Sequence, residues 1–169
     1  MEFSKSDIII RPLRSSDRER FFALATKFFK KDHWRDKELK RLSPMIKYKD
    51  YDKHLSEDLN SYMKLNTRKA VIFVAEYGGE LIGYIYGRVE KKPKMVLDTV
   101  GIIEDYFVEK PYRGRGVSNM LWKRLMSWFR EKKCNRLDIE TYPGNKHAID
   151  LYHKYGFVDK YVVMTKKFK

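Results

Sequence analysis

A turn at 112–118, Tyr-Arg-Gly-Arg-Gly-Val-Ser, contains the residue types that bind anions. Gly114 and Gly116 let the backbone turn sharply and leave its N–H groups uncovered, and Arg113 and Arg115 add two guanidinium groups. Apolar residues at helical spacing follow, so the positive end of a helix dipole points to the same place. The turn therefore predicts a phosphate or pyrophosphate site, although Gly-x-Gly alone is a weak signal that also occurs in turns without a ligand.

The segments on both sides of this turn have to position it. β-branched and aromatic residues at 102–108 favour a buried strand, which Pro111 ends because proline has no N–H for a sheet. We expect that strand to run from Met95 to Val108 and the next helix from Gly116 to about Lys132. A strand at Leu137–Thr141 follows, and a strand–helix–strand unit implies parallel neighbours joined by a right-handed crossover.

The rest of the chain alternates between the two hydrophobic periods of strands and helices. Further strands are expected at Ile8–Ile10, Ala70–Tyr77, Leu81–Val89 and Phe157–Phe168, the last of which closes the sheet. Further helices are expected around Phe21–Phe28, around Asp36–Leu42 with a break before Pro44, from Tyr51 onward, and after an N-cap at Asn145. This order predicts an α/β or α+β fold, a mixed sheet covered by helices, as a single domain over residues 1–169.

Composition limits the compartment and the partners. The 169 residues carry a net charge of +14, spread along the chain, which favours anionic ligands without naming one. Cys134 is the one cysteine, which excludes an internal disulfide and fits a reducing compartment. No secretory signal and no apolar run of membrane-spanning length is visible in the sequence. We therefore expect a cytoplasmic protein with no membrane partner.

Two motifs together resemble one enzyme superfamily. Residues 112–118 are similar to the Arg/Gln-x-x-Gly-x-Gly/Ala pyrophosphate turn of the GNAT superfamily of acetyl-CoA-dependent N-acetyltransferases. Asn-x-x-Ala-x-x-Leu-Tyr-x-x-x-Gly-Phe at 145–157 resembles the helix that carries its general-acid tyrosine, and Glu-Asp-Tyr-Phe-Val at 104–108 is similar to a strand of spermidine/spermine N-acetyltransferases. The resemblance implies a GNAT-like, mostly antiparallel central sheet with a parallel, splayed strand pair, flanked by helices.

The resemblance also implies which residues hold acetyl-CoA or coenzyme A. The strand backbone at Tyr106, Phe107 and Val108 would bind the pantetheine arm, and Asn145 would contact the cofactor from the opposite wall. The amides expected to bind the pyrophosphate are those of Arg113, Gly114, Arg115, Gly116, Val117, Ser118 and Asn119. Ser118 stands where the family has Gly or Ala, so its hydroxyl would either add a hydrogen bond or crowd the phosphate.

Acetyl transfer to an amine needs a base and an acid. An alkyl amine, with a pKa of about 10.4 in lysine, must lose a proton before it attacks a thioester. Glu104 lies two residues from Tyr106 and four from Val108, which predicts one common strand face and makes Glu104 the candidate base. Asp105, facing the other side, is the weaker candidate, and the alternative for Glu104 is a salt-bridged strand carboxylate. Tyr152 matches the family's tyrosine and would protonate the departing thiolate, with a core aromatic as its alternative.

Three functions are open from the sequence. Direct transfer to a small-molecule primary amine is favoured, and transfer to protein N-termini or lysines is the alternative. A non-catalytic basic nucleic-acid-binding module is disfavoured, because the charge is spread and no helix-turn-helix or zinc-ligand pattern occurs. The histidines lack metal-ligand spacing, so no metal site is expected. A homodimer is kept open as the assembly.

Overall fold

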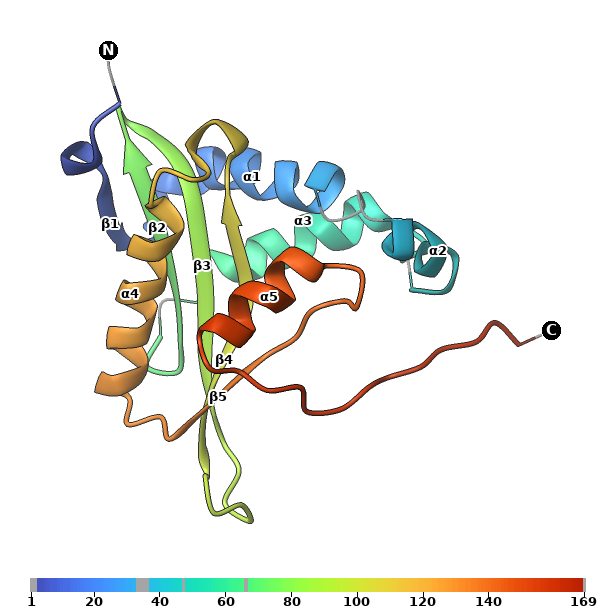
Figure 1. Ribbon diagram of the computed structural model, residues 1–169. Helices are drawn as coiled ribbons and strands as arrows, with labels where there is room; N and C mark the ends of the chain where they lie inside the picture. Colours follow the sequence, from blue (N-terminus) through green and yellow to red (C-terminus); the bar gives the residue numbers. More distant parts are fainter. Residues whose placement is uncertain (1–2, 33–36, 47, 66, 169) are drawn as a thin grey trace.

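A five-stranded sheet forms the centre of the computed structural model, which describes residues 3–32, 37–46, 48–65 and 67–168 (Figure 1). The strands, in sheet order, are β1 (Ile9–Pro12), β2 (Ala70–Tyr77), β3 (Glu80–Lys91), β4 (Thr99–Val108) and β5 (Arg136–Ile139). The first four pair antiparallel, whereas β4 and β5 pair parallel. The predicted mixed sheet with one parallel pair is confirmed.

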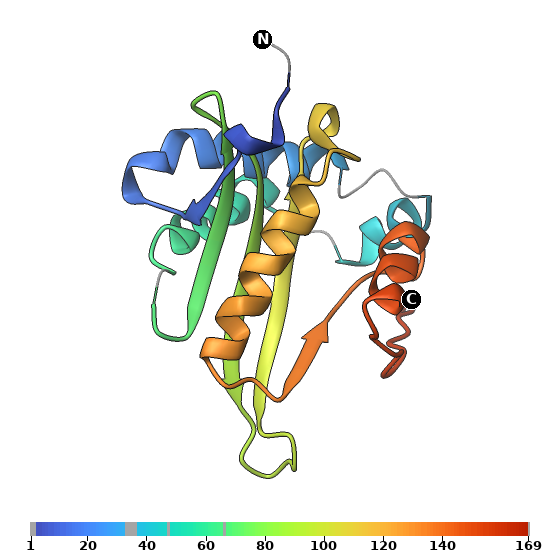
Figure 2. The same ribbon diagram turned by 60° about the vertical axis from the view of Figure 1, so that its left-hand side comes forward.

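Helices cover both faces of this sheet. They are α1 (Arg18–Lys27), α2 (Lys37–Ile46), α3 (Tyr51–Tyr62), α4 (Val117–Glu131) and α5 (Lys146–Lys154). Figures 1 and 2 show α4 on one face, α1 and α3 on the other, and α5 beyond β5. We call these two faces the α4 face and the α1/α3 face. Among the described helices, none combines the length and the apolarity that crossing a membrane requires.

Each face of the sheet has its own apolar core. On the α4 face, Leu121, Leu125 and Phe129 of α4 are buried against the strands. On the α1/α3 face, Phe21 of α1 packs edge-on against Tyr84 of β3, with ring centroids 5.2 Å apart. Strands that are buried on both faces have nearly continuous apolar sequences, and for this reason the sequence predicts β2 and β3 clearly.

The parallel pair β4–β5 is short. The register joins Val100–Ile103 to Arg136–Ile139, and within the described residues β5 makes no pair with 104–108. Figure 2 shows β5 turning away from β4 toward α5. The β5-facing edge of 104–108 therefore presents main-chain groups without a strand partner, and such groups need hydrogen bonds from elsewhere.

Three sequence predictions differ from the observed elements. Residues 157–168 form no strand, because strand pairing needs a neighbouring edge in register and the segment leaves β5 instead (Figure 1). The strand expected from Met95 begins at Thr99, since 94–97 form a turn and bend. Pro44 lies inside α2 rather than ending it, so the last turn of this helix lacks one i→i−4 hydrogen bond.

A buried ion-pair network fixes the start of α1. Asp17 is 0 % exposed, and its carboxylate accepts hydrogen bonds from Arg11 at 2.6 and 2.9 Å and from Arg20 at 2.5 Å. The Arg14 N–H donates to the same carboxylate at 2.8 Å. The hydrogen bonds from Arg11 are the main reason that the pKa of Asp17 is lowered to about 2. Asp17 is therefore ionised and fully satisfied, which is a structural role.

Candidate active site

The turn at 112–118 exposes the N-terminus of α4. Gly114 and Gly116 have φ of 73° and 87°, the left-handed region that favours glycine. The first described main-chain bond into α4 runs from the Met120 N–H to the Gly116 carbonyl at 3.2 Å, and no side chain in the described residues caps the helix. Helix geometry leaves the preceding N–H groups without intrahelical acceptors. The left-handed glycines and the uncapped start of α4 are present, and the binding of a pyrophosphate by these amides stays a prediction.

The two arginine side chains of the turn, Arg113 and Arg115, contact different parts of the protein. Arg113 faces β4: its Nε donates to the Val108 carbonyl at 2.7 Å, and its guanidinium lies 5.5 Å from the Phe107 ring. The Arg113 N–H also donates to the Lys110 carbonyl at 3.2 Å, so this member of the expected pyrophosphate set is not a free donor. Arg115 stacks over Phe3 at 4.8 Å and leaves its charge at the surface.

A lysine from the N-terminal segment completes the positive charge at the turn. A Cβ built on Gly116 would lie 3.0 Å from Lys5 Cε and 3.1 Å from Lys5 Nζ. Gly114, by contrast, has no atom within 4 Å of a built Cβ, so the backbone there faces open space. Open donors, positive side chains and glycine at both strained positions fit a diphosphate group.

A β-bulge changes which way the carboxylates of β4 point. Tyr86 of β3 pairs with Asp105 and Gly87 pairs with Ile103, so Glu104 is the inserted residue. Glu104 pairs with Arg88, which follows Tyr84 and Tyr86 along the α1/α3 face, whereas Tyr106 packs toward α4. The prediction that Glu104 and Tyr106 share a face is therefore wrong, because alternation does not continue through a bulge. The salt-bridged alternative for Glu104 describes its observed contact.

Asp105 lies where β4 has no partner on the β5 side, and it faces α3. Its Oδ2 accepts a hydrogen bond from the Tyr62 hydroxyl at 2.7 Å. Burial raises the pKa of Asp105 to about 6, and the charges of Glu104 and Asp58 add to that rise, while the bond from Tyr62 opposes it. A carboxyl group with this pKa can accept a proton reversibly near neutral pH.

Tyr152 lies on the opposite side of β4, in α5. The Asn145 side chain begins this helix as predicted, accepting from the Ala148 N–H at 3.4 Å. The Tyr152 ring packs against Phe157 with centroids 6.0 Å apart. Burial is the main cause that raises its pKa to about 12, which keeps the hydroxyl protonated. Ring contacts connect Tyr152 to Tyr106 through Phe157 and Trp122, because the Phe157 and Trp122 centroids lie 6.1 Å apart and Trp122 also contacts Tyr106.

Ser118 of α4 also belongs to this cluster. Burial raises the pKa of Tyr106, whose hydroxyl has no hydrogen-bond partner within the described residues, and the nearby Ser118 side chain acts in the opposite direction. The Tyr106 ring lies 6.3 Å from Trp122 of α4, which in turn stacks on Tyr155 of α5 at 4.5 Å. The aromatic cluster therefore joins β4, α4 and α5 beside the diverging strands. The serine that departs from the expected glycine or alanine faces a tyrosine of β4.

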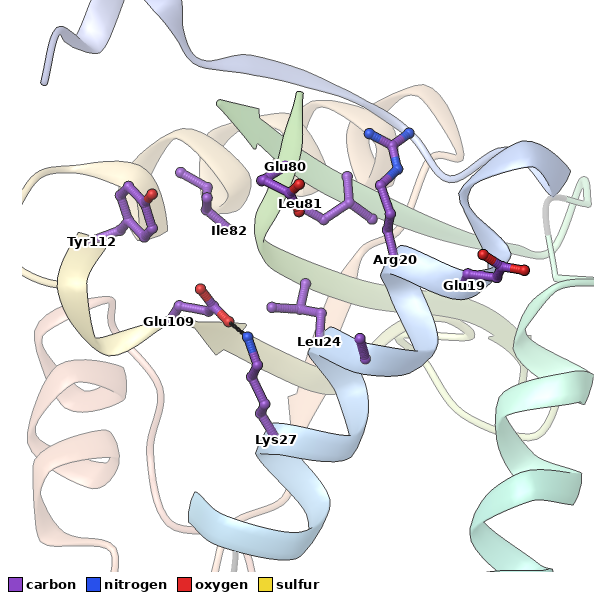
Figure 3. A pocket seen from close by; sticks show the side chains of 10 residues that line it. Glu19, Arg20, Leu24, Lys27, Glu80, Leu81, Ile82, Glu109 and Tyr112 are labelled. Atoms are coloured by element: carbon purple, nitrogen blue, oxygen red, sulfur yellow. Dashed lines mark hydrogen bonds and ion pairs between the residues drawn. The ribbon is translucent and has the colours of Figure 1, made fainter. Parts of the chain in front are cut away.

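A cavity of about 460 Å³ lies next to the turn but outside this cluster (Figure 3). It is bounded by α1, the start of β3 and the segment after β4, and the Lys27–Glu109 ion pair crosses it. Its lining residues are Glu19, Arg20, Ala23, Leu24, Lys27, Glu80, Leu81, Ile82, Glu109 and Tyr112. None of the residues predicted to act in catalysis or cofactor binding lines this cavity.

Sequence comparison agrees with this architecture. The profile of the Acetyltransferase (GNAT) family matches residues 27–157, which is most of the chain, and the protein therefore belongs to that family. Members of this family are N-acetyltransferases that use acetyl-CoA. The matched region contains the turn, the diverging strands, Asp105 and Tyr152.

Individual relatives differ in their acceptors. The chain is 30% identical over 83 residues to a probable spermine N(1)-acetyltransferase of Bacillus subtilis subsp. natto, covering 48% of this chain and 55% of that protein. It is 31% identical over 86 residues to N-alpha-acetyltransferase MAK3 of Arabidopsis thaliana, covering 51% and 44%. It thus spans about half the length of the curated relatives it matches.

Solved structures extend the likeness to the whole fold. Aminoglycoside acetyltransferase AAC(6')-Iy, in complex with a bisubstrate analogue containing CoA, aligns with a TM-score of 0.68 at 18% identity, covering 96% of this chain and 98% of that one. At that identity the likeness shows the fold.

Tyr62, Tyr84 and Lys5 were not singled out from the sequence as site residues. In the sequence, Tyr62 fits the helical spacing of apolar residues after Tyr51, and its hydrogen-bond partner Asp105 lies 43 positions away. Tyr84 is one aromatic residue of the strand expected at Leu81–Val89, and Lys5 precedes the first expected strand. The contacts that matter here are between distant segments, and no local pattern encodes them.

Proposed function

We propose that this protein transfers the acetyl group of acetyl-CoA directly to a primary amine, with a small-molecule amine as the favoured acceptor. The observation that carries this proposal is the departure of β5 from β4 after Ile103, together with the uncapped N-terminus of α4. That departure leaves Asp105 and Tyr106, which still pair with β3, without a strand on the β5 side, and the two faces of this stretch meet different chemistry. An acceptor on the Asp105 side and a thioester on the Tyr152 side would meet there.

The residues present can hold the cofactor. The amides of 114–119 would bind the pyrophosphate, the backbone of 106–108 would bind the pantetheine arm, and Asn145 would lie on the other wall. The Val108 carbonyl already accepts from Arg113, so its N–H side is the part left for a ligand. When bound, acetyl-CoA supplies the activated acetyl thioester.

Asp105 and Glu104 are the two candidates for the base. Asp105 is favoured because its raised pKa suits proton transfer and its carboxylate is held by Tyr62, whereas Glu104 is engaged by Arg88. In the proposed reaction Asp105 takes the proton of the acceptor ammonium. The neutral nitrogen then forms a bond to the acetyl carbon as the carbon–sulfur bond breaks. The Tyr152 hydroxyl gives its proton to the departing sulfur, and the second proton of the acetylated nitrogen returns through solvent to restore that hydroxyl.

Transfer to a protein N-terminus is the second candidate function, because relatives such as the Arabidopsis N-alpha-acetyltransferase act in that class by name. The two functions separate in a thiol-release assay with acetyl-CoA against polyamines, aminoglycosides and short peptides. Small amines should release thiol at a higher kcat/KM than peptides. A preference for peptides would reverse the assignment, and release with no amine at all would contradict acetyl transfer.

The role of Tyr152 has its own test. Tyr152→Phe should lower kcat by about 10²-fold at neutral pH, because a general acid contributes roughly that much or more. Tyr161→Phe is the matched control, since that hydroxyl is exposed and donates to Glu140 at 3.1 Å. Equal rates for Tyr152→Phe and the wild type would leave Tyr152 as a packed aromatic.

A further inference from the structure

Polar groups converge on the α1/α3 face of β4, where that strand leaves β5. The Tyr62 hydroxyl donates to Asp105 at 2.7 Å. The Tyr84 hydroxyl is fully buried and has no hydrogen-bond partner in the part of the chain that the structure describes. Tyr84 pairs with Phe107 and Tyr86 pairs with Asp105, so Tyr84 and Asp105 are diagonal neighbours across β3 and β4. Burial, Asp105 and Tyr62 all raise the pKa of Tyr84. An unpartnered buried hydroxyl costs free energy, which a polar ligand at this point would offset.

A second carboxylate faces the same cluster from the surface. Asp58 precedes Tyr62 by four residues in α3, so the two side chains lie on one face of the helix. Asp58 is exposed, and its charge acts on both Asp105 and Tyr62. The cluster therefore has a negative position in its interior and another at its rim.

Aromatic rings connect the two negative positions. Tyr62 and Tyr86 lie with ring centroids 5.2 Å apart and an interplanar angle of 58°. Ring faces attract ammonium groups and also pack well against methylene groups. An aliphatic chain with a cation at each end matches this sequence of carboxylate, rings and carboxylate.

The other charges near Asp105 leave this local field negative. Tyr62 and Asp58 face it from α3, Tyr84 and Tyr86 from β3, and Glu104 is its neighbour in β4. Arg88 pairs with Glu104 and so balances that carboxylate. Asp105 and Asp58 remain as two negative groups in a chain whose net charge is +14. Such a local reversal of charge selects a small dication over a single ammonium.

We propose that this cluster is the acceptor site for an α,ω-diamine or a polyamine, an inference that rests on the proposed acetyl transfer. The reacting ammonium binds at Asp105 between the Tyr62 and Tyr84 hydroxyls, the aliphatic spacer lies over the Tyr62 and Tyr86 rings, and the second ammonium binds at Asp58. The reacting ammonium gives its proton to Asp105, and Asp105 releases that proton to solvent after transfer. Tyr62 is a positioning residue that orients Asp105.

The first test compares 1,4-diaminobutane with n-butylamine as acetyl acceptors. The wild type should prefer the diamine, and Asp58→Asn should lower kcat/KM for the diamine about five- to tenfold through KM, as an exposed charge pair would. The loss for n-butylamine should be smaller, because that amine has no second ammonium and is affected by Asp58 only through the pKa of Asp105. Glu57→Gln, the adjacent exposed carboxylate on α3, is the matched control and should change neither acceptor.

Three outcomes of this test overturn the proposal. The wild type could show equal kcat/KM for the two amines, or Asp58→Asn could show equal losses for both. Either result contradicts a binding position for the second ammonium and leaves the proposed acetyl transfer intact. The same loss in Glu57→Gln would show a general field effect instead of a site. Absence of transfer to every amine contradicts the proposed function, and this inference with it.

The second test uses Tyr62→Phe, which keeps the ring and removes only the hydroxyl. Loss of the bond to the ionised Asp105 should move the midpoint of the kcat/KM pH profile upward. A purely structural ring would leave that midpoint in place, and an unshifted profile would therefore overturn the positioning role. Tyr84→Phe should reduce kcat/KM for the diamine as well, because the unpartnered hydroxyl is assigned to the reacting ammonium.

Discussion

Two aspartates in this fold, Asp17 and Asp105, have opposite surroundings. Asp17 receives three hydrogen bonds from two arginines and one from a main-chain N–H, and its pKa is lowered to about 2. Asp105 receives one bond from a neutral tyrosine, lies near other carboxylates, and has its pKa raised to about 6. The surroundings of Asp17 stabilise its charged form, which supports the fold. The surroundings of Asp105 leave a carboxyl group that can gain or lose a proton near neutral pH.

The largest expected effect concerns activity at Asp105. Asp105→Asn removes the proton acceptor while keeping the shape of the side chain, so kcat for amine acetylation should fall by about 10²–10⁴-fold. Thiol-release kinetics at pH 7 measure this. Asp17→Asn, assayed at a temperature where it stays folded, is the control and should retain kcat within about twofold. Similar losses in both variants would erase the distinction between the two aspartates.

The converse effect concerns stability at Asp17. Asp17→Asn leaves Arg11, whose side chain is 10% exposed, without its main counter-charge, and should lower the free energy of unfolding by about 3–5 kcal/mol. Urea denaturation at pH 7 measures this loss. Asp52→Asn breaks an exposed pair with Lys30 and should cost less than about 1 kcal/mol. A cost below 1 kcal/mol at Asp17 as well would mean that the network contributes little.

The pH dependence of stability should have opposite signs at the two sites. The folded-state pKa of Asp17 is depressed, so its contribution is present above pH 4 and is lost as the pH falls toward 2. The folded-state pKa of Asp105 is raised from 3.8 to about 6, so a penalty appears as the pH rises through that window. Asp105→Asn should therefore be about 1–2 kcal/mol more stable than the wild type at pH 7 and equal to it at pH 4. Unfolding curves at both pH values check this. A variant less stable than the wild type at pH 7 would contradict a free-energy penalty from the ionised, buried Asp105.

The smallest effect is expected at Glu104. Because its carboxylate pairs with Arg88 at the surface, Glu104→Gln should lower kcat/KM by only about two- to fivefold, and the midpoint of the pH profile should move slightly downward because Glu104 no longer raises the pKa of Asp105. Steady-state kinetics between pH 5 and pH 9 measure both quantities. A loss as large as that of Asp105→Asn would make Glu104 the base, as the sequence alone suggested.

The contrast between the two aspartates also shows what sequence patterns can predict. The turn at 112–118, the helix after it and the Asn145 cap depend on residues within a few positions of one another, and all three form as expected. The direction of Glu104 was mispredicted because a bulge depends on how β3 and β4 pair, and that pairing leaves no mark in the 104–108 segment.

Long-range contacts account for the other differences. The Tyr62–Asp105 bond and the Arg11–Asp17–Glu76 network join segments far apart in the chain, so spacing could not reveal them. Residues 157–168 have strand-forming side chains, yet Val162 and Met164 are 80% and 89% exposed because no strand of the described sheet pairs with them. Intrinsic preference predicts where a strand can form, and a partner edge decides whether it does.

The central claim is that the turn before α4 binds coenzyme A, and calorimetric titration of the protein with CoA tests it most directly. The wild type should give a saturable heat, and Gly116→Ala should weaken binding at least tenfold, which is about 1.4 kcal/mol. Gly79→Ala is the matched control, because Gly79 has a φ of 83° in the β2–β3 turn and should bind CoA like the wild type. Absence of heat with the wild type at millimolar CoA would contradict the account.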